Sequence, residues 1–261
     1  MTTKEATTRL RIVLLCGRGP SSNIVFHHLM QQHDVVAVVE ARPSRRQLVR
    51  RRWEKLGPRV VLGQLLFQGG VVPMLSLASR GRRAELLRLH RLSVAAIPKQ
   101  QCREVDTVND PAALVAIGQH RPEIVVVNGT RIISQHTIDA IGLPMVNLHA
   151  GITPMYRGVH GGYWALAEGQ PQWFGVTLHR IDAGIDTGGI LAQATGTPTP
   201  RDNFSTYPLL QLAMGLPLLD AHLIEVVSRV QPQTAPPLST SRLRSHPTLA
   251  QYLSALLRGV R

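Results

Sequence analysis

The chain has 261 residues, of which 44% are hydrophobic and 17% are charged. A chain of this length and composition buries a substantial core without metals or disulfides, which excludes a disordered or low-complexity protein. The formal net charge of +13 is compatible with acidic partners, namely phosphate esters, nucleic acid or an anionic membrane surface.

The first elements predict a βαβ unit. Leu10–Cys16 is a continuous apolar run, which is typical of a strand buried on both faces of a parallel sheet. A glycine-containing turn follows it, then a helix that begins near Asn23, and then a second strand, Asp34–Glu40. This order indicates an α/β protein with helices packed on the faces of its sheet.

The turn after the first strand is a candidate anion site. Backbone N–H groups at the start of a helix favour a phosphate, and the candidate substrate-binding residues are therefore Gly17, Gly19, Ser22 and Asn23. As a dinucleotide fingerprint the turn is incomplete, because Ser22 stands in the third glycine position, although Glu40 lies where a ribose-binding acid would lie. Two alternatives stay open: a tight turn in which Ser22 caps the helix, and a nucleotide-binding module without catalysis.

A basic segment follows. Between Arg42 and Arg91 lie thirteen basic and two acidic residues, so this segment holds most of the net charge. Inside it, Val60–Ser79 is apolar, but Gly69, Gly70 and Pro73 make it a poor membrane-spanning helix. The pattern predicts an apolar hairpin flanked by cations. It is either an interfacial anchor on an anionic membrane surface, or a helical subdomain that covers the site or forms a homodimer.

The rest of the chain continues the alternation of strands and helices. The predicted strands are Ser93–Ile97, Glu123–Asn128, Met145–His149, Phe174–Arg180 and Ile190–Thr195. The predicted helices are Asp110–Gln119, Ser134–Ile141, Gly162–Glu168, Tyr207–Arg229 and His246–Arg258. We therefore predict a Rossmann-like α/β fold with a mostly parallel sheet, whose last strands include an antiparallel pair. Residues 1–200 form the main domain, with an insert at 42–92. Residues 201–261 form a helical C-terminal extension, which contains a proline-rich connector at 231–237.

Several classes of site are excluded by the motifs. Cys16 lies inside a strand and Cys102 in a polar connector, so both are expected to be inert. Neither an HExxH pattern nor a CxxC pair is present, and we predict no metal site. A GxSxG nucleophile elbow is also missing. The polar start of the chain shows no targeting segment, which predicts a cytoplasmic location, peripheral to the membrane if the basic segment is an anchor.

The constellation that carries chemistry begins at Asn147. Asn147 and His149 are two residues apart on one strand, so their side chains share a face near its C-terminal end. Asp182 and Asp186 follow in a glycine-rich loop after a later strand. The amide can donate to a developing oxyanion, the imidazole can move a proton, and a carboxylate can orient the imidazole. These residues predict a site for acyl transfer.

This region resembles the folate-dependent formyltransferase family. In that family an Asn-x-His motif is followed by a proline-containing loop, an aromatic-Arg-Gly triplet and an Asp-Thr-Gly triplet. The matching residues here are Asn147, His149, Pro154, Tyr156-Arg157-Gly158 and Asp186-Thr187-Gly188. The resemblance covers roughly residues 10–40 and 93–200. One departure is the loop after His149, where Ala150-Gly151-Ile152-Thr153-Pro154 replaces the usual Pro-Ser-Leu-Leu-Pro, which puts folate contacts there in doubt.

The resemblance implies the roles of individual residues. Asn147, His149 and Asp186 would be the catalytic triad, with Asp186 raising the pKa of His149. The donor would be 10-formyltetrahydrofolate, in a pocket lined by Arg131, Ile132, Ile133, Ile181, Asp182, Gly184 and Asp186. The acceptor would be a primary amine, and Tyr156, Arg157 and His160 would lie on its side, although His160 is equally compatible with a simple helix entry.

The resemblance leaves the acceptor open. We expect a small molecule such as an amino sugar, a ribonucleotide or an amino-acid-like amine. We consider tRNA an unfavoured partner, because the family member that formylates initiator tRNA carries a C-terminal β-barrel, whereas residues after Pro200 here have a helical pattern. A formyltetrahydrofolate hydrolase, which delivers water from the same triad, is the alternative enzyme.

Overall fold

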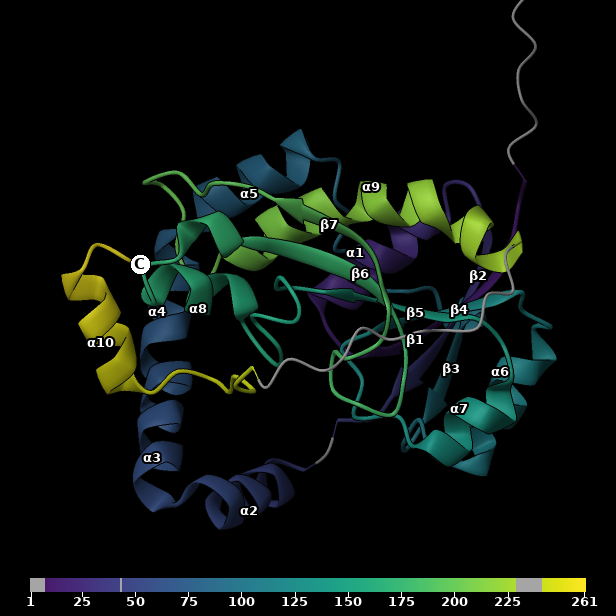
Figure 1. The fold of residues 1–261 in the computed structure, drawn as a ribbon, viewed down its shortest axis with the longest axis horizontal. Coiled ribbons are helices and arrows are strands. Elements are labelled where there is room, and N and C mark those ends of the chain that lie inside the picture. Colours follow the sequence, from purple (N-terminus) through teal and green to yellow (C-terminus); the bar gives the residue numbers. More distant parts are fainter. Residues whose placement is uncertain (1–7, 43, 229–240) are drawn as a thin grey trace, which may run out of the picture.

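The sheet has seven strands. In this computed structural model, which describes residues 8–42, 44–228 and 241–261, the strand order is β3-β2-β1-β4-β5-β6-β7 (Figure 1). The strands are β1 (Arg11–Gly17), β2 (Asp34–Glu40), β3 (Cys102–Val105), β4 (Ile124–Asn128), β5 (Met145–His149), β6 (Gly175–Arg180) and β7 (Ile190–Thr195). The pairs from β3 to β5 are parallel, and β6 and β7 are antiparallel to their neighbours. The predicted fold class, with its antiparallel end, is confirmed.

Helices cover both faces of this sheet. One face packs against α1 (Pro20–Leu29) and α9 (Tyr207–Ser228), and the other against α6 (Pro111–Gln119) and α7 (Gln135–Ile141). Strand β1 contributes alternate residues to the two layers, because Ile12 and Leu14 belong to the first cluster and Val13 and Leu15 to the second. A strand buried on both faces must be apolar at every position, which is the physical reason for the run predicted as a strand.

Two predicted boundaries in the first half are wrong. Helix α1 begins at Pro20, not near Asn23, because proline suits the first turn of a helix, where its missing N–H is not needed. The strand expected at Ser93–Ile97 is not formed, and β3 follows later, after a short 3₁₀ turn at Lys99–Gln101. Carbonyl groups of the 93–97 segment accept hydrogen bonds from side chains of α1 instead, at Val94 and Ala95.

The C-terminal helix is shorter than predicted. Helix α10 spans Leu249–Leu257, because Thr248 and Gln251 form a reciprocal capping box that starts it. His246 and Pro247 therefore lie before the helix, in an extended segment. Helix α8 (Gly161–Ala167) and a 3₁₀ turn at Pro171–Trp173 lie between β5 and β6. The predicted connector 231–237 lies outside the described residues.

The basic segment is helical throughout and is not a hairpin. It forms α2 (Arg45–Leu56), α3 (Pro58–Leu66), a π-helical turn (Phe67–Val71), α4 (Val72–Ala78) and α5 (Arg80–Leu89). In the π turn the N–H of Val72 bonds to the carbonyl of Phe67, and Pro73 follows directly. The wider turn absorbs the proline, which lacks an N–H, so the helix continues where a break was expected.

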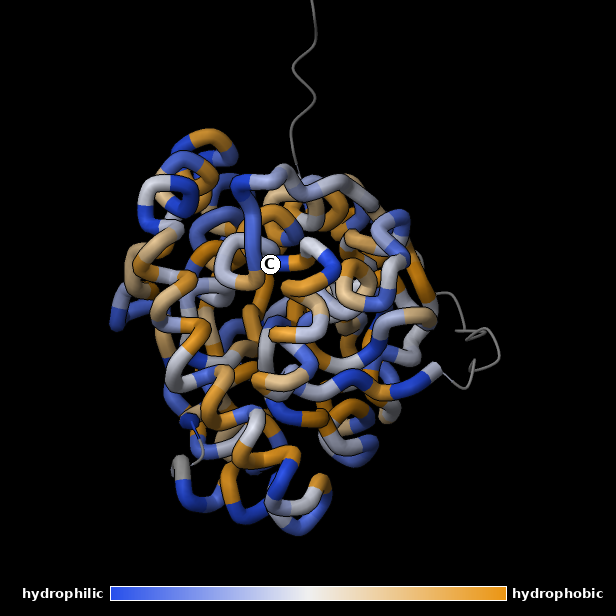
Figure 2. The backbone as a smooth tube through the Cα atoms, turned by 90° about the vertical axis from the view of Figure 1, so that its left-hand side faces the viewer, coloured by the Kyte–Doolittle hydropathy of each residue, from blue (hydrophilic) through white to orange (hydrophobic). Residues whose placement is uncertain are grey.

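Two described helical runs, 58–78 and Tyr207–Ser228, have the length and hydropathy of a membrane-spanning helix. The second is α9, whose Leu216 and Leu219 are buried against the sheet, as in the core helix of a globular protein. The run 58–78 was expected to be a poor membrane-spanning helix. Its length and mean hydropathy are nevertheless those of a spanning helix. Figure 2 shows hydrophobic and hydrophilic residues mixed on the insert helices at the lower end of the molecule.

The insert packs on the body through an aromatic cluster. Phe67 is fully buried, and its ring lies 4.9 Å from the rings of both Phe204 and Tyr252. Arg82 adds a bidentate ion pair with the buried carboxylate of Asp202, at 2.8 and 3.1 Å. The insert is therefore an integral part of the fold.

We expect the Phe67→Ala substitution to lower the free energy of unfolding by about 3–5 kcal/mol, since it leaves a large cavity in this cluster. Leu62→Ala is the matched control, because Leu62 is 57% exposed on the same helical run and should change stability by less than about 0.5 kcal/mol. Urea unfolding of both variants measures the difference. Equal effects at the two positions would show that the insert does not fold with the body.

Candidate active site

The site lies where β5 ends. Asn147 and His149 leave this strand on the same face, and β6 pairs with it in antiparallel register, so that Asn147 lies opposite His179 and His149 opposite Thr177. His149 is buried. The carboxyl edge of the parallel strands is the usual place for ligands in an α/β sheet.

Asp186 comes from the loop between β6 and β7. Its backbone is left-handed, with φ of 52°, a conformation that aspartate tolerates better than most residues. The side chain of Asp182 holds the loop from within, because its carboxylate accepts hydrogen bonds from Thr187 Oγ1 at 2.6 Å and from the N–H of Gly184 at 3.0 Å. Arg157 Nε donates to the carbonyl of Ile185 at 2.8 Å. The loop is thus fixed on both sides of the catalytic candidate.

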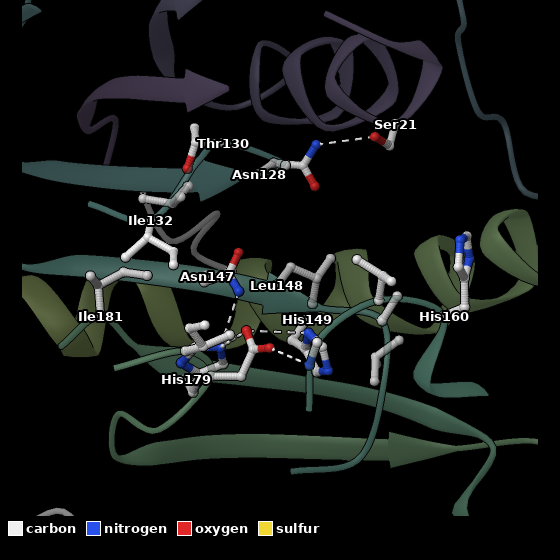
Figure 3. A pocket seen from close by; sticks show the side chains of 18 of the residues that line it. Ser21, Asn128, Thr130, Ile132, Asn147, Leu148, His149, His160, His179 and Ile181 are labelled. Atoms are coloured by element: carbon white, nitrogen blue, oxygen red, sulfur yellow. Dashed lines mark hydrogen bonds and ion pairs between the residues drawn. The ribbon is translucent and has the colours of Figure 1, made fainter. Parts of the chain in front are cut away.

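The three predicted catalytic residues line one cavity, and Figure 3 shows Asn147 and His149 side by side in it. Oδ1 of Asp186 lies 3.3 Å from Nδ1 of His149, and Oδ2 accepts the N–H of Gly158 at 2.8 Å. On its other side, His149 Nε2 donates to the carbonyl of Tyr156 at 2.8 Å. Because a carbonyl only accepts, this contact assigns the proton to Nε2, and Nδ1 is left as the nitrogen that can take up a proton beside Asp186.

His179 is a fourth member that the sequence did not reveal. Asn147 Nδ2 lies 3.0 Å from His179 Nε2, and His179 Nδ1 lies 2.7 Å from the carbonyl of Arg180. The carbonyl requires a proton on Nδ1, so Nε2 accepts from the amide and orients it. The second N–H of that amide remains for a ligand. The alternating pattern of residues 174–180 predicts the strand that carries His179. The pairing register that places His179 opposite Asn147 cannot be predicted from the sequence of either strand alone.

Burial sets the protonation states. It lowers the pKa of His149 and outweighs the charge of Asp186, which acts in the opposite direction. Burial also tends to raise the pKa of Asp186, but the neighbouring His179 and His149 side chains and the N–H of Gly158 outweigh it, so this pKa lies below its usual value. The expected rise of the His149 pKa is therefore absent. At neutral pH the site holds a neutral imidazole and an ionised carboxylate.

These residues open into a cavity of about 680 Å³. It is lined by Asn147, His149 and Asp186 and by every residue predicted for the donor pocket, namely Arg131, Ile132, Ile133, Ile181, Asp182 and Gly184. Figure 3 shows Ile132 and Ile181 on one side of the catalytic residues and His160 on the other. The cavity thus has two ends that meet at Asn147 and His149.

The other predicted substrate residues do not line this cavity. Ser21 and Asn128 of the same region line it, whereas Gly17, Gly19, Ser22 and Asn23 do not. Gly17 is required by packing, because a Cβ there would overlap the carbonyl of Gly129. The backbone carbonyl of Tyr156 accepts from His149, and the guanidinium of Arg157 donates to the carbonyl of Ile185. Both residues therefore support the site from within the protein. Roles of these six residues in binding a substrate remain predictions.

Glu40 is occupied within the protein. Its carboxylate is 4% exposed and accepts the N–H groups of Val108 and Arg131 at 3.0 and 2.9 Å. Both oxygens are therefore used to join the loops after β3 and β4. A carboxylate in this state is not available to a ribose, which removes the main support for the alternative of a nucleotide-binding module.

The fold and the site together define an α/β protein with a candidate catalytic site at the end of β5. Residues 11–207 match the family model described as formyl transferase, and the chain belongs to that family. The resemblance found in the motifs, and the enzyme class that it implied, are confirmed at this level.

The curated relatives correct one expectation. The chain is 34% identical over 110 residues to a methionyl-tRNA formyltransferase of Chlorobium chlorochromatii, covering 42% of this chain and 34% of the relative. It is 38% identical over 108 residues to the one of Koribacter versatilis, covering 41% and 33%. The chain thus matches about a third of these relatives' length. The expectation that disfavoured tRNA is wrong, because these curated relatives are methionyl-tRNA formyltransferases.

Solved structures share the fold at low identity. A sugar N-formyltransferase from a Shewanella species superposes with a TM-score of 0.53 at 16% identity, covering 94% of this chain and 86% of that one. Glycinamide ribonucleotide transformylase 1 from Symbiobacterium toebii gives 0.56 at 15%, covering 87% and 92%. These likenesses support the architecture and do not select an acceptor.

Proposed function

We propose that this chain transfers a formyl group from 10-formyltetrahydrofolate to a primary amine. The observation that carries the proposal is the convergence of Asn147, His149 and Asp186 in one cavity with two ends. Family membership supports the reaction class, and the geometry supports the assignment of these three side chains to it.

The donor end suits the proposed co-substrate. Ile132, Ile133 and Ile181 supply apolar walls, and the backbone of the Asp182–Asp186 loop supplies polar groups beside them. A flat heterocycle with an amide-like edge needs this combination of an apolar slot and fixed hydrogen-bonding groups. The co-substrate supplies an activated formyl group when bound.

The residues of the chain would act on that group as follows. The lone pair of the amine nitrogen attacks the formyl carbon, and the carbonyl electrons move to the formyl oxygen. This oxygen accepts a hydrogen bond from the free N–H of the Asn147 amide. His149 Nδ1 takes the proton that the amine loses, and Asp186 stabilises the imidazolium. When the bond between the formyl carbon and the folate nitrogen breaks, that proton passes to the departing nitrogen.

The proposal keeps both kinds of acceptor. The methionyl-tRNA relatives support an aminoacyl group on tRNA, and the two-ended cavity is equally compatible with a small amine. We also propose that residues 1–200 form the catalytic unit with 201–261 as its extension, and that the protein works in the cytoplasm. The comparisons offer no support for a membrane-peripheral location.

An acceptor panel tests the proposal. The protein is incubated with 10-formyltetrahydrofolate and, separately, methionyl-tRNA, glycinamide ribonucleotide or a nucleotide-linked amino sugar, and folate release and formylated product are both measured. We expect one acceptor to be formylated by the wild type and not by Asn147→Ala. Folate release without formylated product would identify the hydrolase instead. No release with any acceptor by a folded protein would refute the proposal.

A further inference from the structure

A segment from the C-terminal part of the chain borders the cavity. Residues 241–248, here called the strap, run beside α3 toward α10 (Figure 1). The strap is hydrogen-bonded to the loop that follows β5, since the N–H of Arg244 bonds to the carbonyl of Arg157 at 2.9 Å and its carbonyl accepts from the N–H of Val159 at 3.1 Å. It therefore lies against the same loop whose Gly158 holds Asp186.

The insert holds the strap in place. Gln64 of α3 is buried, and its Nε2 donates to the carbonyl of His246 at 2.8 Å and to the hydroxyl of Ser245 at 3.3 Å. Gly63 lies so close to Thr248 that a Cβ there would overlap its side chain. From the other side, Trp164 Nε1 donates to the carbonyl of Ser245 at 2.9 Å. The strap is thus fixed between the insert and α8.

The strap brings His246 to His160. Nδ1 of His246 lies 2.9 Å from Nε2 of His160, and both residues line the cavity that holds the catalytic candidates. The ring of His160 rests 4.6 Å from that of Phe204 in the aromatic cluster. Gly161, the next residue, packs directly on Gly151, two residues after His149. The histidine pair therefore forms a wall of the cavity, and Figure 3 shows His160 on the far side of His149 from Ile132 and Ile181.

The pair offers one donor and one acceptor to a ligand. Burial and the neighbouring His246 lower the pKa of His160 to about 3, and burial and the charge of Arg52 lower that of His246 to about 4, so both rings are neutral at pH 7. One N–H lies between them. Whichever ring supplies it, the two outer nitrogens, His160 Nδ1 and His246 Nε2, are left as one N–H and one bare nitrogen. The two outer nitrogens lie on the far sides of the two rings, so one hydroxyl meets only one of them. An alcohol can both donate and accept, and therefore bonds to whichever of the two it meets.

We propose that the His160–His246 pair recognises a hydroxyl group of the amine acceptor, and that Gln64 of the insert is the positioning residue that holds His246 for this contact. The inference rests on the proposed function, because it assigns this end of the cavity to the acceptor. It also gives the insert a role that does not depend on its charge. The acceptor class that follows is a hydroxylated primary amine, as in an amino sugar or a ribosyl amine.

Binding of two probe amines tests the recognition. D-glucosamine and cyclohexylamine are primary amines on six-membered rings, and only the first carries hydroxyls. Dissociation constants are measured by ligand-detected NMR with tetrahydrofolate present. We expect glucosamine to bind the wild type about tenfold more tightly, and His246→Phe and His160→Phe to remove this preference while tetrahydrofolate affinity stays unchanged. His136→Phe, an exposed site on α7, is the control and should keep the preference.

The role of Gln64 has its own matched control. Gln64→Leu removes both hydrogen bonds to the strap, whereas Gln68→Leu alters a half-buried glutamine whose Nε2 has no partner among the described residues. We expect the first substitution to reduce the glucosamine preference at least threefold and the second to leave it unchanged. Equal effects of the two substitutions would overturn the positioning role.

The probe experiment measures binding and the acceptor panel measures turnover. The recognition of a hydroxyl can therefore be refuted separately from the proposed function. A wild type that binds both probes equally, or binds neither, overturns the recognition of a hydroxyl. The same holds if the preference survives in His246→Phe. Failure of the proposed function appears instead as unchanged 10-formyltetrahydrofolate in the acceptor panel.

Discussion

Replacing His149 with alanine should lower kcat of formyl transfer by about 10²–10⁴-fold, the usual contribution of a positioned proton-transfer group. His149 has its unprotonated nitrogen 3.3 Å from Asp186, whereas the unprotonated nitrogen of His179, 3.6 Å from the same carboxylate, is already occupied by the Asn147 amide. Without His149, the proton that leaves the amine must go to water, which is a much weaker base than imidazole.

The measurement separates this loss from damage to the fold. His136→Ala removes an exposed histidine of α7 outside the cavity and should keep the wild-type kcat. Circular dichroism and urea unfolding show whether His149→Ala remains folded, since it empties a buried position. If a folded His149→Ala variant keeps more than a tenth of the wild-type kcat, His149 is not the proton carrier.

The sequence predicted those site residues whose relative positions are fixed within a single strand or loop. Asn147 and His149 share a face because they are two apart on one strand, and no tertiary information is needed to see it. Residues 131–133 follow the carboxyl end of β4, at the edge of the sheet where β5 also ends. Residues 181–186 follow β6, which is antiparallel to β5, so their loop starts beside Met145 and its place in the site was predicted from the motif alone. All of these site residues except Ala183 line the same cavity.

The parts that were missed depend on contacts between distant segments. His179 orients Asn147 only because β6 pairs with β5 in one particular register, and a shift of one residue would turn it to the other face. His246 meets His160 across 86 residues of chain, through a strap held by the insert. The insert itself was misread because Gly69, Gly70 and Pro73 signal a break, and a π turn accommodates them.

The contacts between the insert and the strap give the insert a structural role that does not depend on its positive charge. The basic residues attracted attention to acidic partners, but the buried residues of α3 and the π turn, Gln64 and Phe67, face the strap and the aromatic cluster. This inner face supports the wall of the cavity next to the catalytic residues. The cationic outer face is a separate feature, and the histidine wall does not depend on it.

Acid should destabilise this protein between pH 7 and pH 5 by roughly 2–4 kcal/mol, because of His160 and His246. Their folded-state pKa values are about 3 and about 4, and both return to the ordinary value of about 6.5 on unfolding. The unfolded chain therefore binds more protons below pH 6.5. The stability is complete above that pH and is lost as the pH falls, at about 2 kcal/mol per histidine by pH 5.

Urea unfolding at pH 7 and pH 5 measures this loss, and a double variant assigns it. With His160→Gln and His246→Gln combined, nothing in the pair titrates, so the difference between the two pH values should shrink by most of the 2–4 kcal/mol even if the variant is less stable at both. His136→Gln should keep the wild-type difference. The remainder belongs to His149 and His33, whose pKa values burial also lowers. If the double variant loses as much stability as the wild type between pH 7 and pH 5, the pair is not held neutral in the folded protein, and the wall would then present a cation to the acceptor.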